Sequence, residues 1–133
     1  MSSDVLAANQ AFYDAFARRD LAAMERIWAR VAPVACTHPG WDALHGREDV
    51  LESWRAIMEG GGSPEIRCVR ARAFVLGDVA FVTCQEVVPG GRLIATNLFV
   101  KEDGGWRIAH HHAGPIGAVE SEEPRHPPGV SLN

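Results

Sequence analysis

Residues 79–112 read VAFVTCQEVVPGGRLIATNLFVKEDGGWRIAHHH, and apolar and polar side chains alternate along them in three runs. Such alternation is the pattern of β-strands that bury one face of a sheet. The connections PGG and EDGG are short and rich in glycine, which is typical of hairpin turns. A further alternating run, EIRCVRARAFVL at residues 65–76, precedes them across a Gly-Asp turn. We therefore predict a four-stranded antiparallel meander in the second half of the chain.

The first half of the chain has a helical pattern. Between residues 4 and 19, apolar side chains recur every three or four residues, which predicts an amphipathic helix with Asn9 on its polar face. Asp20 can cap a second, short helix, because its carboxylate can accept from the unpaired N–H groups of the first turn. A third helix begins near Arg47 and ends at the glycines of residues 60–62.

The order of these segments defines the fold class and the extent of the domain. Residues 31–40, VAPVACTHPG, predict a short edge strand, since proline cannot donate to a central ladder. Helices followed by strands place the chain in the α+β class. The 133 residues suffice for one domain with its own core, which we predict over residues 1–115. Residues 116–133 combine charge, proline and glycine with little to bury, which predicts a flexible C-terminal tail.

Composition and charge indicate which kinds of partner the protein has and in which compartment it is found. The formal net charge is −4, from 13 basic and 17 acidic residues, and the basic residues form no cluster, which argues against nucleic acid as a partner. No apolar stretch is long enough to span a bilayer, and the N-terminus lacks the pattern of a signal peptide. We therefore expect a cytoplasmic protein with no membrane partner. Three widely spaced cysteines, Cys36, Cys68 and Cys84, favour reduced core thiols over a disulfide framework.

The chain resembles a known superfamily in two segments, LHGREDVLESW at residues 44–54 and FVKEDGGWRIAHHHAGP at residues 99–115. These segments and the order of elements are similar to the NTF2-like superfamily, and within it to SnoaL-like proteins of the SnoaL-3 and DUF4440 type. The resemblance covers Val5 to about Pro115. It implies a cone in which three N-terminal helices pack in the concave face of a curved antiparallel sheet, with an apolar pocket between them. It also implies a homodimer formed through the outer face of the sheet.

The last run of alternating residues ends in three histidines. Strict alternation places His110 and His112 on the face of Trp106 and Ile108, which we expect to line the pocket, and it turns His111 outward. Because an imidazole titrates near neutral pH, His110 and His112 are candidates for general acid–base catalysis. The alternative is that these rings only pack at the end of the strand with one hydrogen bond each.

Other residues are candidates for catalysis or ligand contact. The loop THPGWDALHG before the third helix contains Asp42, which can orient or activate an imidazole. The alternative for Asp42 is that its carboxylate caps backbone N–H groups of the turn. Glu86, Thr96 and Asn97 interrupt the strands, and any of them that faces inward needs a buried partner. The predicted catalytic residues are His110, His112 and Asp42, and the predicted ligand contacts are Tyr13, His38, Trp41, Trp54 and Asn97.

Metal and cofactor chemistry receive little support from the sequence. His110 and His112 could share a Zn²⁺ with His38 or His45, but a His-x-His pair is a weak signal. The chain has no His-Glu-x-x-His motif and no cysteine cluster, so we predict no metal. It also has no nucleotide-binding loop and no haem signature, so we predict no cofactor.

Two functions remain open at this stage. In the first, the protein binds a small apolar molecule, and a pocket histidine can catalyse an isomerisation, dehydration or cyclisation. In the second, it is a non-catalytic homodimeric association module whose pocket is filled by core side chains. The superfamily contains both kinds of protein, so the fold does not decide between them or say whether the chain is an enzyme.

Overall fold

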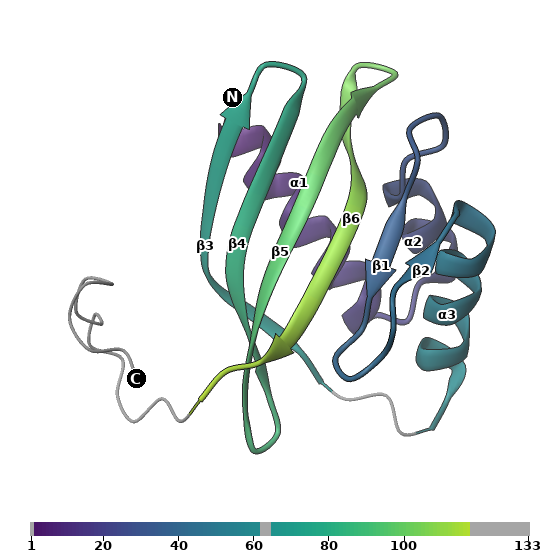
Figure 1. The fold of residues 1–133 in the computed structure, drawn as a ribbon, viewed down its shortest axis with the longest axis vertical. Helices are drawn as coiled ribbons and strands as arrows, with labels where there is room; N and C mark the ends of the chain where they lie inside the picture. The colour runs from purple at the N-terminus through teal and green to yellow at the C-terminus, as the bar shows by residue number, and fades with distance from the viewer. Residues whose placement is uncertain (1, 62–64, 118–133) are drawn as a thin grey trace.

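The long strands follow the helices along the chain (Figure 1). The computed structural model describes residues 2–61 and 65–117, so the predicted tail lies outside the described residues from residue 118 onward. The helices are α1 (Ser2–Ala17), α2 (Leu21–Ile27) and α3 (Arg47–Glu59). The strands are β1 (Ala35–Thr37), β2 (Leu44–His45), β3 (Arg67–Leu76), β4 (Val79–Val88), β5 (Gly91–Glu102) and β6 (Gly105–Pro115).

The strands form one sheet in the order β2-β1-β6-β5-β4-β3. β3 to β6 pair antiparallel in sequence order, so the predicted meander is confirmed. β1 pairs in parallel with β6, and β2 pairs with the other side of β1. The sheet is therefore mixed and not wholly antiparallel. The prediction of an edge strand within residues 31–40 is wrong, because β2 forms the edge and Pro33 precedes β1 without interrupting its ladder.

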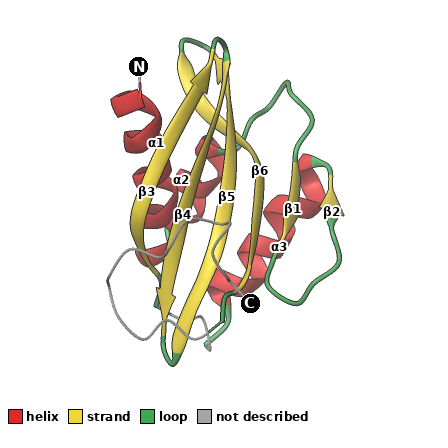
Figure 2. Cartoon of the chain, turned by 60° about the vertical axis from the view of Figure 1, so that its left-hand side comes forward, coloured by secondary structure: helices red, strands yellow, loops and turns green. Residues whose placement is uncertain are grey.

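The three helices lie on one face of the curved sheet, which does not close on itself (Figure 2). α1 packs across β3, β4 and β6, while α3 packs against β1 and β2. The α+β cone predicted from the resemblance is thus confirmed. Among the described residues, no helix is long and apolar enough to cross a membrane. The largest fully buried side chains of the core are Val5, Phe12, Met24, Trp28, Val50, Met58, Val82, Phe99 and Ile108, with Asn9, Cys36 and Asn97 among them.

Local chemistry explains where the helices begin and end. Asp20 caps α2 as predicted, because its carboxylate accepts from the N–H of Ala23 at 3.0 Å. α3 begins after Gly46, whose φ of 92° favours glycine, and it ends at Gly60. The loop between β1 and β2 packs against the middle of α3, where His38 contacts Ser53 and Trp54.

Two charged side chains fasten the segment that follows α2. The guanidinium of Arg47 donates to three backbone carbonyl oxygens between Glu25 and Ala29, at 2.7–3.0 Å. The carboxylate of Glu102, near the end of β5, accepts from the backbone N–H groups of residues 30–32 at 2.8–3.0 Å. Each side chain satisfies backbone groups that no ladder or helix supplies with partners.

β6 contains a bulge. Leu98 of β5 pairs with His110, but the next residue, Phe99, pairs with Ile108, so Ala109 is an extra residue in β6. Ile108 and Ala109 are both buried although they are neighbours. A bulge of this kind shifts the alternation of every residue beyond it by one.

The bulge reverses the predicted orientation of the three histidines. His111 is buried on the helix side of the sheet, while His110 is half-buried and His112 is exposed. The prediction that His110 and His112 face inward and His111 faces outward is therefore wrong. Its premise, strict alternation from Trp106 onward, fails at Ala109.

Candidate functional site

A cavity of about 230 Å³ lies between α1, α3 and the inner face of the sheet. Aromatic and aliphatic side chains form most of its wall, and its main polar groups belong to Tyr13, His38, Glu86 and His111. Within residues 2–61 and 65–117, no lysine or arginine lines it. The residues that line the cavity are Phe12, Tyr13, Phe16, His38, Pro39, Trp41, Trp54, Ile57, Ile66, Glu86, Val88, Leu93 and His111.

A larger and more open hollow, of about 680 Å³, adjoins this cavity between α1 and the start of β3. The two share Tyr13, Phe16, Ile66 and Val88. The wall of the larger hollow is partly charged and faces solvent, whereas the buried Glu86 and two buried histidines line the smaller cavity. We therefore take the smaller cavity as the candidate site.

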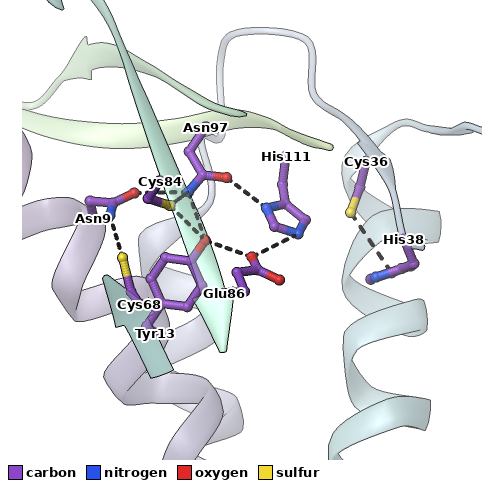
Figure 3. A network of polar contacts seen from close by, with 9 residues as sticks. All are labelled: Asn9, Tyr13, Cys36, His38, Cys68, Cys84, Glu86, Asn97 and His111. Atoms are coloured by element: carbon purple, nitrogen blue, oxygen red, sulfur yellow. Dashed lines mark hydrogen bonds and ion pairs between the residues drawn. The ribbon is translucent and has the colours of Figure 1, made fainter. Parts of the chain in front are cut away.

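Tyr13 connects α1 to the sheet at the inner end of the cavity (Figure 3). Its hydroxyl donates to Oε2 of Glu86 at 2.6 Å and accepts from Nδ2 of Asn97 at 3.1 Å. The Sγ of Cys84 lies 3.3 Å from the same hydroxyl. Burial raises the pKa of Tyr13, and the neighbouring Glu86 and Cys84 raise it further, so the phenol keeps its proton.

His111 lies between Asn97 and Glu86, with 2% of its surface exposed (Figure 3). Its Nδ1 is 2.6 Å from Oδ1 of Asn97, and its Nε2 is 3.9 Å from Oε2 of Glu86. Burial, and to a smaller extent the nearby histidines, lower the pKa of His111 to about 3. The ring is therefore neutral at physiological pH.

Glu86 is the buried carboxyl group of the cavity. It lies on β4, on the face shared with Ala80, Val82 and Cys84. Burial raises the pKa of Glu86, and the hydrogen bond from Tyr13 opposes this in part. No cationic side chain of the described residues lines the cavity, so no positive charge in its wall offsets this shift toward the protonated form. A proton donor and a proton acceptor thus lie side by side.

His38 is a second neutral imidazole, on the α3 side of the cavity. Its Nε2 lies 2.8 Å from Oγ of Ser53, and burial lowers the pKa of His38 to about 4. The rings of Trp41 and Trp54 pack edge-on against it, at centroid distances of 4.8 and 4.6 Å. Trp41 is 47% exposed, so it forms the rim of the cavity.

The structure brings together most of the predicted ligand contacts. Tyr13, His38, Trp41 and Trp54 all line the cavity. Asn97 lies behind this wall, where it bonds both Tyr13 and His111. The contact of these residues with a ligand stays a prediction.

The predicted catalytic residues do not meet at the cavity. His110 has its Nδ1 3.1 Å from the carbonyl oxygen of Ala35, and its ring stands edge-on to His112 at 6.1 Å. Neither residue lines the cavity. Asp42 is exposed, and its Oδ1 accepts from the N–H of Ala43 at 2.7 Å, as the turn interpretation expects.

Three residues of the buried network lie where the sequence pattern did not predict a functional side chain. Asn9 lies on the buried stripe of α1 and not on its polar face, and its position four residues after Val5 already indicated this. Glu86 was noted only as an interruption, although it shares the parity of the apolar residues of β4. For His111 no local signal existed, because nothing in the sequence marks the bulge at Ala109.

Comparisons with known proteins agree with this architecture. The model of the SnoaL-like domain matches residues 5–116. A solved NTF2-like protein from Streptomyces avermitilis, described as a candidate dehydratase, is 34% identical with a TM-score of 0.80, over 88% of this chain and 96% of that one. A candidate calcium/calmodulin-dependent protein kinase type II association domain from Thiobacillus denitrificans is 33% identical with a TM-score of 0.73, over 83% of this chain and 93% of that one.

A curated relative carries the same kind of segment within a longer protein. The F-box protein SKIP8 of Arabidopsis thaliana is 32% identical over 113 residues, which are 82% of this chain. The chain spans about half of that protein, 48% of its length. With the domain match over residues 5–116 and a fold shared with NTF2-like structures, the chain belongs to the SnoaL-like domain family.

Proposed function

We propose that the protein binds a small, largely apolar molecule in the 230 Å³ cavity and moves a proton on it through Glu86 and His111. One observation carries this proposal: a buried carboxyl with a raised pKa lies 3.9 Å from a buried, neutral imidazole. Such a pair offers an acid and a base at once to a bound molecule. The apolar wall provides for the rest of the ligand.

The pair is suited to a reaction that takes a proton from carbon and gives one to oxygen. Nε2 of His111 can accept a proton from a carbon beside a carbonyl group, while Glu86 protonates an oxygen of the same molecule. If that oxygen is the carbonyl, an enol forms and can return with its double bond moved. If it is a β-hydroxyl, the C–O bond breaks and water leaves. After the dehydration, a proton passes from His111 to Glu86 and restores the starting state. In the isomerisation, His111 returns its proton to a carbon of the enol while Glu86 takes back the proton of the enol oxygen.

The remaining predicted contacts fit roles in binding. Tyr13 donates to Glu86 and holds it in place, and His38, Trp41 and Trp54 form the wall opposite. The likeness to the Streptomyces avermitilis protein, described as a candidate dehydratase, supports dehydration over isomerisation. His110 and His112 have no part in this reaction.

A β-hydroxy ketone tests the proposal. The purified protein is incubated with 3-hydroxycyclohexanone, and the enone absorbance is followed against a blank. We expect the rate above the blank to fall by about 100-fold or more in Glu86→Gln and in His111→Gln, since an acid or base in place contributes this much. The matched control is His112→Gln, which changes an exposed histidine of the same strand and should keep the rate.

The same variants show which part of the proposal fails. Equal rates in the wild type and in a folded His111→Gln variant would contradict proton transfer by this pair. No reaction with the probe, together with thermal stabilisation by it, would leave binding in place and remove the reaction.

A second candidate function is association through the outer face of the sheet. Large apolar side chains are exposed on the outer face of β3, β4 and β5, and Ile94 of β5 is 44% exposed. An exposed apolar patch of this kind is typical of an interface. The 33% identity to a kinase association domain supports this function for the chain. Association through the outer face does not require a ligand in the cavity, so the two candidate functions can be tested independently.

A further inference from the structure

The hydrogen bonds around His111 determine which of its ring nitrogens carries the proton. Nδ2 of Asn97 donates to Oδ1 of Asn9 at 2.8 Å and to the hydroxyl of Tyr13 at 3.1 Å. The amide oxygen of Asn97 therefore faces His111 and can only accept, so Nδ1 of His111 carries the proton of the 2.6 Å bond. In a neutral ring, Nε2 is then left with a free lone pair.

Glu86 has the opposite character. Its Oε2 already accepts from Tyr13, and no described residue hydrogen-bonds its other oxygen, Oε1. Within residues 2–61 and 65–117, only three indole nitrogens are both fully buried and without a hydrogen-bond partner. Oε1 has no partner and is not among these atoms, so it is not fully buried. Burial raises the pKa of Glu86 and so favours its protonated form, in which Oε1, the oxygen free of Tyr13, carries the proton where a ligand in the cavity can reach it.

We propose that the cavity selects an uncharged ring compound that bears a hydroxyl group, and that it rejects charged molecules of the same shape. The hydroxyl donates to Nε2 of His111 and accepts from the carboxyl of Glu86. The inference rests on the proposed binding function and names its ligand class. With Nε2 and Oε2 3.9 Å apart, one oxygen atom can lie about 2.8 Å from the imidazole and within reach of the carboxyl.

The size and the charge of the cavity both support this class. An apolar cavity of about 150 Å³ is known to hold benzene, so about 230 Å³ admits one substituted ring. A carboxylate ligand would meet the buried Glu86 without any lysine or arginine of the described residues to balance it. An ammonium ligand would meet two imidazoles held neutral, His38 and His111.

Four probes of one shape test the proposal on the full chain: benzyl alcohol, toluene, benzoate and benzylammonium. Their dissociation constants are measured by calorimetry at neutral pH. We expect benzyl alcohol to bind at least tenfold more tightly than each of the other three. In Glu86→Gln its affinity should stay within threefold, because the amide still supplies a donor, whereas Glu86→Leu and His111→Phe should lose tenfold or more.

A second measurement needs no ligand. The ¹⁵N shifts of the ring nitrogens of His111 distinguish the protonated nitrogen from the free one, and we expect Nδ1 to carry the proton. In Asn97→Leu this preference should be lost. A proton on Nε2 in the wild type would overturn the proposal, whatever the variants do.

The outcomes separate this inference from the function on which it rests. Binding of toluene and benzyl alcohol with equal affinity, unchanged in His111→Phe, would overturn the inference and keep the cavity as a binding site. Tighter binding of benzylammonium than of the alcohol would show that Glu86 is ionised, and would overturn it as well. If none of the four probes bound to the folded protein, the proposed binding function would fail too.

Discussion

His111 and His38 are held without charge by the same physical cause, although they bond different partners. Neither has a carboxylate close enough for a strong ion pair, and both are almost fully shielded from water. Burial therefore lowers the pKa of His111 to about 3 and that of His38 to about 4. Their neutrality must be visible in the stability of the protein, because the unfolded chain titrates normally.

We expect the free energy of unfolding to fall when the pH drops from about 6.5 to about 5. In this range the unfolded chain protonates both histidines and the native state protonates neither, so each lowers the stability by about 2 kcal/mol. Glu86 acts in the opposite sense, since its raised pKa favours the native state as the pH falls. Two histidines outweigh one carboxyl, so we expect a net loss of stability, which urea unfolding across this range measures.

Replacing one histidine tests the assignment. In His111→Gln, His38 and Glu86 remain and act in opposite senses, so the stability should depend less on pH in this range than it does in the wild type. His112→Gln should keep the wild-type slope, since His112 is exposed. Identical slopes in all three proteins would contradict a neutral, buried His111.

Tyr13 is the residue on which the buried network depends most directly. Tyr13→Phe leaves Oε2 of Glu86 and one N–H of Asn97 without this partner, so we expect a loss of about 1–3 kcal/mol in thermal or urea unfolding. A second change, Glu86→Leu, removes the acceptor as well. The double variant should then lose less than the sum of the two single variants, because the two groups share one hydrogen bond. Additive losses would contradict the coupling.

At the scale of elements, the junction between α2 and α3 depends on Arg47. Arg47→Met removes three hydrogen bonds to backbone carbonyl oxygens at the end of α2, and we expect a loss of about 2 kcal/mol in urea unfolding. Arg55→Met is the matched control on the same helix. Its ion pairs with Glu52 and Glu59 are exposed, so it should cost about 0.5 kcal/mol or less. Equal losses for the two variants would refute the role of Arg47.

The elements themselves were largely predictable, and the reasons are local. The alternation of β3 to β6, the cap at Asp20 and the glycines after α3 each act within a few residues, so their signals are complete in the sequence. The pairing of β1 with β6 is not local, because residues 35–37 meet residues 110–112. The bulge at Ala109 is set by that tertiary context, since alanine has no preference that marks it. This one position explains why the candidate site included the outer histidines in place of His111.

At the scale of the whole molecule, the two faces of the sheet differ. The inner face is covered by helices and encloses the cavity, while the outer face exposes apolar side chains on β3, β4 and β5. Phe74 and Phe81 stack there at a centroid distance of 4.8 Å, and Ile94 lies on the strand beyond. Such a face is suited to a second copy of the chain, which is the homodimer that the resemblance implies.

We expect the wild-type protein to be a dimer at micromolar concentrations, as measured by light scattering coupled to size-exclusion chromatography. Ile94→Glu places a charge on the apolar outer face and should shift the protein to the monomer. His111→Gln changes the inner face only and should leave the dimer intact. A monomeric wild type would remove the outer face as an interface and, with it, the second candidate function.

The run of three histidines has a consequence for how β6 tolerates mutation. With the bulge, His111 points to the helices; if the bulge were lost by a slip of one position, His110 and His112 would take the inward parity instead. In either register an imidazole reaches the interior. A mutation that removes the bulge should therefore exchange His111 for His110 or His112 at the inner face, and the interior keeps a histidine in both registers.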